Sequence, residues 1–134
     1  KEGEALNLEE LYENRPVTIY LDETCRFSEN ISSFAHCVDG VNMKLMKCGG
    51  ITEALKIIKT ARKYKLKTMI GCMSESSVSI AAAAALSGGI DHIDLDSHYN
   101  LAPDPSTGAP RVDGVTLPPD SPGHGGELKK EFYA

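Results

Sequence analysis

The sequence predicts an α/β fold with parallel strands, and three observations support this prediction. Apolar segments with strand character recur about every 24 to 26 residues, at 17–22, 41–46, 67–72 and 91–96. Segments with helical periodicity fill the gaps between them. Charged side chains lie near the carboxyl ends of three of these strands, at Asp22, Lys44, Asp94 and Asp96. Alternating strands and helices at this period indicate parallel βαβ units with right-handed crossovers.

The charged side chains are expected on one face of each strand. Because side chains alternate along a strand, Lys44 is expected on the face opposite to Val41 and Met43. Asp94 and Asp96 share a face of the last strand, about 7 Å apart. Functional groups at the carboxyl ends of parallel strands are typical of the active site of a (β/α) barrel.

The number of strands predicts half of such a barrel. Four βα units do not close an eight-stranded barrel, and an open sheet would leave its charged face beside an unpaired edge. We therefore predict that residues 1–100 form the C-terminal half of a TIM-type (β/α) barrel, with the other half upstream or on another chain. For residues 101–134 we predict an extended tail, because residues 102–126 hold all but one of the seven prolines. One short strand is expected within it, near 112–117.

Helices are expected before the first strand and in each gap. They are predicted at 1–14, within 28–37, at 51–63 and at 76–86. In the third, apolar residues recur at helical spacing at Ile51, Ala54, Leu55, Ile58 and Ala61. Ser76 and Ser77 are expected to cap the last helix, which Gly88-Gly89 would end.

The composition argues against several kinds of partner. A net charge of -5 without a Lys/Arg cluster argues against nucleic-acid binding. No apolar run is long enough to span a bilayer and no secretory signal is seen, so no membrane partner is expected. The spacing of the four cysteines fits no zinc site and predicts reduced structural thiols in a cytoplasmic protein; they are Cys25, Cys37, Cys48 and Cys72.

Asp22 and Lys44 are candidates for metal binding and proton transfer. A carboxylate at a strand end suits Mg²⁺, although Asp22 could equally cap a loop or helix. Lys44 is a candidate base because a nearby metal or other cations can lower the pKa of a lysine. Its alternative is a side chain that carries its amine to water at the end of the sheet. Glu23 is expected on the other face in a supporting role, and Lys47 as a surface charge.

Asp94 and Asp96 form the clearest pair. Two carboxylates on one strand face repel each other unless a cation lies near them, although a solvated strand end is the alternative. Gly49-Gly50 favours a tight turn over a phosphate-binding loop. The polar segment 73–76 is expected to line the same site, to cap the following helix, or both.

Four segments at the predicted strand ends together carry a family resemblance. They are LDET at 21–24, NMKLMKCGG at 42–50, IGCMSES at 70–76 and IDLD at 93–96. In this order they resemble the second half of the catalytic barrel of the enolase superfamily, muconate-lactonising subgroup. Within that subgroup the sequence is most similar to dipeptide epimerases of the L-Ala-D/L-Glu type. The resemblance spans about residues 15–126.

The resemblance implies a barrel with a capping domain, toward which the tail at 101–134 packs back. It implies Mg²⁺ held by three carboxylates, of which Asp22 matches the third. Lys44 matches an acid/base lysine that faces the α-carbon of the substrate. The implied reaction is a 1,1-proton transfer through an enolate stabilised by magnesium, with a second lysine on the opposite face.

The resemblance also implies substrate-binding residues. Asp94 and Asp96 match the pair that binds the α-ammonium group of a dipeptide. Cys72 and Ser74 fall in the loop that lines the substrate pocket in such enzymes. Departures at 98–100 and 122–126 leave the preferred substrate side chains open, and the oligomeric state stays open too, a homo-oligomer included.

Two alternatives are kept. A cycloisomerase or o-succinylbenzoate synthase of the same superfamily would retain Asp22 and Lys44 but needs no carboxylate pair for an ammonium group. A half-barrel that serves as a non-catalytic interaction module is the second. The opposing Lys-x-Lys base and the first two metal carboxylates are not found in this sequence. The chain alone is therefore expected to be inactive without the N-terminal half of the barrel.

Overall fold

The structure, a computed structural model, describes residues 4–133. A parallel sheet forms its centre, with the strands in sequence order: β1 (Tyr20–Leu21), β2 (Gly40–Met43), β3 (Lys67–Ile70) and β4 (His92–Ile93). Each neighbouring pair is parallel. Sequential order with parallel pairing is the arrangement of consecutive βα units in a barrel. The predicted α/β class is therefore confirmed.

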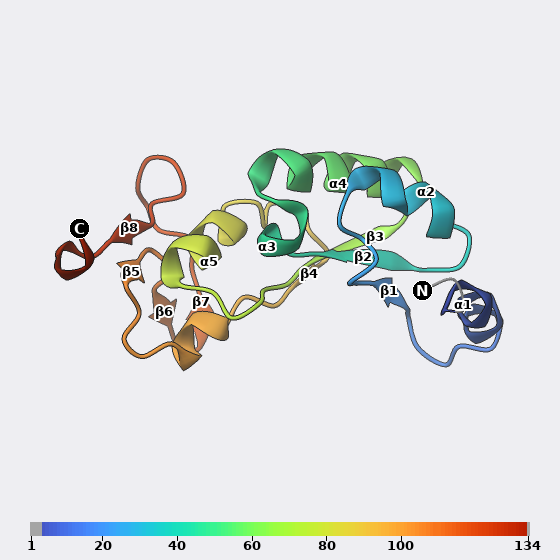
Figure 1. Cartoon of the computed structure of the whole chain (residues 1–134), viewed down its shortest axis with the longest axis horizontal. Coiled ribbons are helices and arrows are strands. Elements are labelled where there is room, and N and C mark those ends of the chain that lie inside the picture. Colours follow the sequence, from blue (N-terminus) through green and yellow to red (C-terminus); the bar gives the residue numbers. More distant parts are fainter. Residues whose placement is uncertain (1–3, 134) are drawn as a thin grey trace.

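Helices precede and connect the strands (Figure 1). They are α1 (Glu4–Glu13), the 3-10 helix η1 (Ser28–Asn30), α2 (Ile31–Phe34), α3 (Leu45–Cys48), α4 (Ile51–Lys63) and α5 (Ser77–Ala84). The helices α2 and α4 lie side by side over the sheet in Figure 1. Residues 1–3 of the first predicted helix lie outside the described residues. Within the described part of the chain, no helix combines the length and apolar character needed to cross a membrane.

The face of α4 that packs toward the sheet differs in part from the predicted one. Its buried residues are Ala54, Ile57, Ile58 and Ala61. The prediction was wrong for Ile51 and Leu55, which are exposed, because the buried face centres on Ile57. Met43 of β2 and Ile70 of β3 are completely buried in the same core cluster. Burying one such side chain contributes about 1.5–3 kcal/mol.

The strands end earlier than predicted. The second predicted strand, 41–46, stops at Met43, and Lys44 is the extended residue that precedes α3. Local hydrogen bonds replace the sheet there, because the N–H of Cys48 donates to the Lys44 carbonyl and that of Gly49 to the Leu45 carbonyl. Gly49 then ends the turn at a φ of 84°, in the left-handed region that favours glycine. Lys44 therefore lies just beyond the strand rather than within it.

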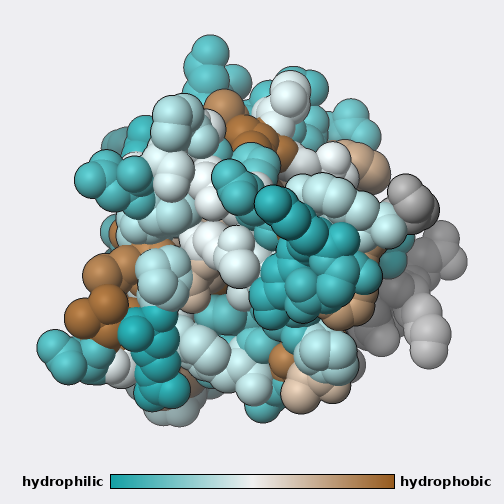
Figure 2. All heavy atoms as spheres, turned by 90° about the vertical axis from the view of Figure 1, so that its left-hand side faces the viewer, coloured by the Kyte–Doolittle hydropathy of each residue, from teal (hydrophilic) through white to brown (hydrophobic). Residues whose placement is uncertain are grey.

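The tail is partly regular. The 3-10 helix η2 (Ser97–Asn100) leads into it. The tail itself contains the 3-10 helix η3 (Lys130–Phe132) and the strands β5 (Ser106–Thr107), β6 (Arg111–Val112), β7 (Val115–Thr116) and β8 (Glu127–Leu128). The single strand predicted near 112–117 is instead the β6–β7 hairpin, because Asp113 and Gly114 turn the chain with positive φ angles. The strands β5 and β8 form a second antiparallel pair. Figure 2, which views the molecule from this end, shows a mostly hydrophilic surface with scattered apolar groups.

The tail is attached to the N-terminus of α5. The Asp104 carboxylate accepts hydrogen bonds from the N–H groups of Ser77, at 3.0 Å, and Ser106, at 2.9 Å. The Ser106 hydroxyl accepts one from the N–H of Val78 at 3.0 Å. Ser76 occupies the position before the helix but makes no side-chain cap. The predicted cap is therefore supplied by residues of the tail, about 27 positions away.

Candidate functional site

Asp22 directly follows β1, where two lysines meet its carboxylate. Lys44 Nζ lies 3.0 Å from Oδ2, and Lys47 Nζ donates to Oδ1. Burial alone would raise the pKa of Asp22, but the hydrogen bonds from Lys47 and Lys44 outweigh it and lower that pKa. Asp22 is therefore a charged carboxylate at the carboxyl end of the sheet, as the sequence predicted.

The Lys44 amine is held between two carboxylates. Its side chain is 14% exposed, and Nζ lies 3.0 Å from Asp22 and 3.6 Å from Glu23 Oε1. Burial acts to lower the pKa of Lys44, but the hydrogen bond and charge of Asp22 raise it overall. The lowered pKa expected from nearby cations is thus not found in the described residues.

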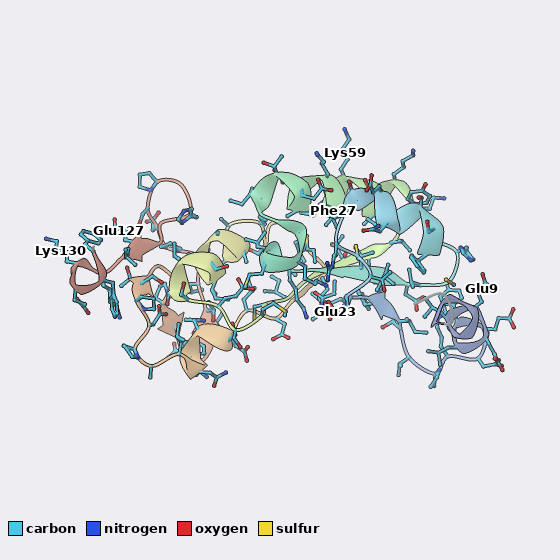
Figure 3. All side chains as sticks on the ribbon, viewed as in Figure 1. Glu9, Glu23, Phe27, Lys59, Glu127 and Lys130 are labelled. Atoms are coloured by element: carbon cyan, nitrogen blue, oxygen red, sulfur yellow. The ribbon has the colours of Figure 1, made fainter. Side chains whose placement is uncertain are left out.

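Glu23 and Lys47 differ from their predicted placement. Glu23 approaches the same amine as Asp22, and Figure 3 places it on the side of the sheet away from α4. The Lys47 side chain is only 5% exposed, so its prediction as a surface charge was wrong. Its Nζ donates to the Asp22 carbonyl at 2.6 Å and to the Asn42 carbonyl at 3.2 Å as well as to the carboxylate. The short helix α3 turns Lys47 back toward the sheet. The prediction missed this because it extended the strand to residue 46, where the structure has a helix.

Lys44, Gly71 and Asp94 form one row across the strand ends. The strand register aligns Met43 with Ile70 and Ile70 with Ile93. The next hydrogen bonds continue it, because Gly71 N–H donates to Met43 O and Asp94 N–H to Ile70 O, both at 2.9 Å. Neighbouring strands lie about 4.8 Å apart, so the backbones of Lys44 and Asp94 are about 10 Å apart. Because the two residues are aligned, their side chains leave the same face of the sheet.

Gly71 leaves room for the side chains beside it. A Cβ atom at this position would lie 2.9 Å from Asn42 Oδ1 and 3.4 Å from Lys44 Cε. The Asn42 amide is buried, and its Oδ1 has no hydrogen-bond partner in the described residues. The absence of a side chain at Gly71 therefore lets the Lys44 stem lie over the neighbouring strand.

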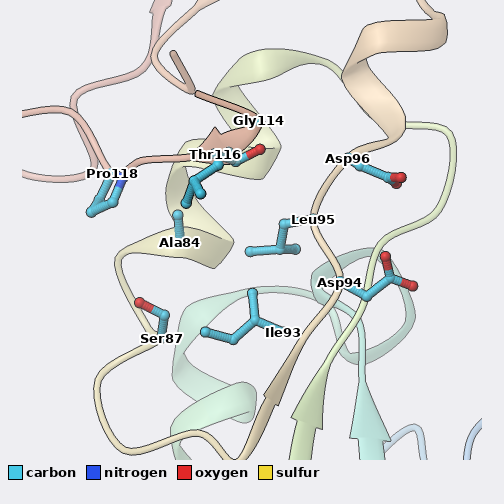
Figure 4. A pocket seen from close by; sticks show the side chains of 10 residues that line it. Ala84, Ser87, Ile93, Asp94, Leu95, Asp96, Gly114, Thr116 and Pro118 are labelled. Carbon is cyan, nitrogen blue, oxygen red and sulfur yellow. The ribbon is translucent and has the colours of Figure 1, made fainter. Parts of the chain in front are cut away.

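Asp94 and Asp96 lie beyond the last strand rather than within it, because β4 ends at Ile93. Figure 4 shows both carboxylates directed to one side of the chain and the Ile93 and Leu95 side chains to the other. The cavity of about 390 Å³ in that figure lies on the apolar side, between α5, β4 and the β6–β7 hairpin. Asp94 and Asp96 are among the residues that line this cavity, but Figure 4 shows their carboxylates on the side opposite to Ile93 and Leu95. We therefore distinguish the cavity from the site that these carboxylates would form with Lys44.

The loop after β3 extends toward Lys44 and Lys47, the two lysines that contact Asp22. Cys72 is half-buried and Ser74 exposed. Met73 lines a cavity of about 270 Å³ together with Glu23, Arg26, Met46 and Lys47. Glu75, which no sequence pattern singles out, is buried and hydrogen-bonded within the loop. Met73 and Glu75 are thus further residues of this region, and the roles of Cys72 and Ser74 stay predictions.

The carboxylates suit a hard cation. Asp22 and Glu23 both approach the Lys44 amine, so their oxygens already converge on one positive charge. Oxygen ligands of this kind are those that Mg²⁺ prefers. The described residues contain no group of three or more His, Cys, Asp and Glu side chains placed to hold a metal ion. Asp22 fits as one ligand of a magnesium site, and further ligands would have to come from elsewhere.

Comparison with known proteins decides the family. The family model described as "Enolase C-terminal domain-like" matches residues 2–132. The chain belongs to this family. The resemblance drawn from the four sequence segments is therefore confirmed, and so is the assignment of the parallel strands to part of such a barrel.

Two relatives named hydrophobic dipeptide epimerase are similar to the chain. One, from Flavobacteria bacterium (strain MS024-2A), is 74% identical over 134 residues, which are 100% of this chain and 38% of the relative. The other, from Roseobacter litoralis, is 63% identical over 121 residues, which are 90% of this chain and 35% of the relative. The chain thus spans little more than a third of the length of these relatives.

A solved structure of the family has the same fold. It is the dipeptide epimerase from Enterococcus faecalis V583, complexed with Mg and the dipeptide L-Leu-L-Tyr. The two structures agree with a TM-score of 0.84 at 33% sequence identity, over 94% of this chain and 38% of that chain. The sheet that carries Asp22, Lys44 and Asp94 therefore has the fold of the corresponding part of that enzyme.

Proposed function

We propose that this chain works within a dipeptide epimerase that acts on hydrophobic dipeptides. The observation that carries the proposal is the row formed by Lys44, Gly71 and Asp94, with Asp96 directed to the same side. It brings a candidate base and two carboxylates to one face of the sheet. The names of the two relatives support this substrate class.

Lys44 would move the proton at the α-carbon of the C-terminal residue of the dipeptide. Its side chain is largely covered and its amine is held by Asp22 and Glu23, so its position is defined before substrate binds. Inversion requires a second base on the opposite face of that carbon. We expect this base in the N-terminal half of the barrel, which with the capping domain is the proposed partner of the open edges of β1 and β4.

Asp22 would be a ligand of Mg²⁺. The ion, when bound, supplies electrostatic stabilisation of the negative charge that develops on the substrate carboxylate. Lys47 holds both the carboxylate and the carbonyl of Asp22. We therefore propose that Lys47 orients Asp22 for metal binding.

Asp94 and Asp96 would bind the α-ammonium group of the dipeptide. Charge-assisted hydrogen bonds to both carboxylates would hold the substrate and relieve the repulsion between them. Their backbone distance from Lys44, about 10 Å for Asp94, is compatible with a dipeptide whose two ends are bound by different strands. The half-buried Cys72 and the exposed Ser74 would contact the substrate from the neighbouring loop.

We also propose that the protein works in the cytoplasm. Its four cysteines are free thiols, as is usual for proteins of that reducing compartment.

A substrate panel tests the proposal. The complete protein, incubated with magnesium, should invert L,L-dipeptides with hydrophobic side chains, as followed by chiral chromatography. The matched panel contains a muconate and the precursor of o-succinylbenzoate, neither of which carries an ammonium group. If only the compounds of the second panel are turned over, the proposed epimerase activity is wrong and a cycloisomerase or synthase activity takes its place. Binding without turnover of any substrate would favour an interaction module.

A further inference from the structure

Glu75 is a buried carboxylate whose two oxygens are both occupied. The residue is 5% exposed. Oε1 accepts a hydrogen bond from the N–H of Met73 at 2.8 Å, and Oε2 accepts one from the Ser79 hydroxyl. The N–H of Glu75 donates to the Ser97 hydroxyl at 3.4 Å. The Glu75 side chain thus links the loop after β3 to the helix α5, and the backbone of the same residue reaches Ser97, which follows Asp96.

These bonds are not needed to cap α5. The N–H groups of Ser77 and Val78 are bound by Asp104 and Ser106. Those of Ser79 and Ile80 donate to the carbonyl of Ser76. The first turn of the helix is therefore satisfied without Glu75. The buried Glu75 carboxylate therefore serves the loop instead, because its Oε1 accepts the hydrogen bond from the backbone N–H of Met73.

The position of Met73 matters for the site. Its side chain lines the cavity of about 270 Å³ that also contacts Glu23 and Lys47. Glu23 in turn lies 3.6 Å from the Lys44 amine. The cavity therefore opens beside the candidate base, and a substrate side chain placed there would meet the flexible, apolar surface of Met73.

We propose that Glu75 is a positioning residue that fixes Met73 in this cavity and thereby sets the preference for hydrophobic substrate side chains. The proposal rests on the proposed function, because it assumes that the cavity receives a substrate group. Glu75 acts only through the loop and touches no reacting atom. Its loss should therefore weaken binding of the substrate side chain more than it slows the chemical step.

Kinetics of the complete protein test the proposal. Glu75→Ala should raise KM for hydrophobic dipeptides about tenfold and leave kcat within about twofold. Glu75→Gln should restore KM, because an amide can accept from Met73 and donate to the Ser79 hydroxyl. Glu53→Ala is the matched control. Glu53 also accepts one backbone N–H and one serine O–H, both from Ser28, but lies on α4.

A second readout needs no turnover. Cys72 is the one cysteine of the described residues that is not buried, and it lies next to Met73. Alkylation of Cys72 by iodoacetamide should become about tenfold faster in Glu75→Ala but not in Glu53→Ala, because only the first change frees the loop. Ser79→Ala, which removes one partner only, should give a smaller acceleration and serves if Glu75→Ala does not fold.

The outcomes separate the two proposals. If the unmodified protein turns over no dipeptide, the proposed function fails, and the alkylation rates still decide whether Glu75 holds the loop. If Glu75→Ala matches Glu53→Ala in both KM and alkylation rate, Glu75 has no positioning role. A fall in kcat with unchanged KM would likewise overturn the proposal, since it would place Glu75 in the chemical step.

Discussion

Lys47 binds Asp22 twice, through the side-chain carboxylate and through the backbone carbonyl at 2.6 Å. Lys44 meets the other carboxylate oxygen at 3.0 Å. The two lysines therefore hold Asp22 differently: Lys47 fixes its backbone and side chain together, whereas Lys44 contacts the side chain alone. This arrangement gives the candidate metal ligand a defined orientation at the end of β1.

Asp22→Asn should weaken magnesium binding by the complete protein. The amide retains the shape of the side chain but loses the charge that a hard cation requires. We expect the dissociation constant for Mg²⁺, measured by calorimetry, to rise at least about tenfold. Glu29→Gln, an exposed carboxylate on η1, is the control and should bind as the unmodified protein does. Equal affinities for Asp22→Asn and its control would remove Asp22 from the metal site.

Lys44→Ala should abolish epimerisation while sparing proton exchange on one face. Loss of a positioned base typically lowers the rate by a factor on the order of 10² to 10⁴. Deuterium should still enter one epimer of the substrate from ²H₂O, through the base expected on the opposite face. Proton NMR of each epimer measures this exchange. Persistence of turnover at the unmodified rate would exclude Lys44 from the proton transfer.

Gly71→Ala should lower kcat by displacing the Asn42 amide and, through it, the neighbouring Lys44 stem. The added methyl group would lie 2.9 Å from Asn42 Oδ1 and 3.4 Å from Lys44 Cε. A displacement of about 1 Å at a reacting group can cost about 10²-fold in rate. Gly88→Ala is the matched control, because a Cβ there meets no atom within 4 Å. If both variants have the same kcat, the space over Gly71 is not needed by Lys44.

Glu53 should contribute stability that depends on pH. Hydrogen bonds from the backbone and side chain of Ser28 lower the pKa of Glu53 from 4.5 to about 2. Because the folded pKa lies below the ordinary one, the stabilisation is complete above about pH 4.5 and is lost as the pH falls toward 2. The urea midpoint should therefore be higher for the unmodified protein than for Glu53→Gln at pH 6, and this difference should shrink toward pH 2.5. A constant difference across this range would contradict the assignment.

Much of the fold could be predicted because it depends on local periodicity. The four parallel strands and the helix at 51–63 follow from the spacing of apolar residues, and so does the common side of Asp94 and Asp96. The burial of Lys47 depends instead on a single helical turn, α3, inside a segment with strand-like alternation. The capping of α5 by Asp104 joins residues far apart in sequence, which no local pattern indicates.

The site shows the same division. Asp22 and Lys44 could be selected because a charged side chain in or directly after an apolar strand is seldom buried without a partner. Glu75 could not, since a glutamate in a polar loop is ordinary until its burial is known. Gly71 likewise gains its meaning only from the neighbouring strand, on which Asn42 and Lys44 occupy the space above it.

The central claim is that Asp94 and Asp96 bind a substrate ammonium group on the same face as Lys44. The most direct measurement compares kcat/KM of the complete protein for a free hydrophobic dipeptide and for its N-acetylated form. Asp94 and Asp96 are exposed in this chain, and we expect the rest of the barrel to cover them in the complete protein. Losing one partner of a charge pair in such a covered site costs about 2–5 kcal/mol, so the acetylated dipeptide should be at least about 30-fold poorer. Asp96→Asn should narrow this gap and leave magnesium affinity unchanged. Equal turnover of the free and acetylated dipeptides would contradict the claim and leave a cycloisomerase as the better explanation of the site.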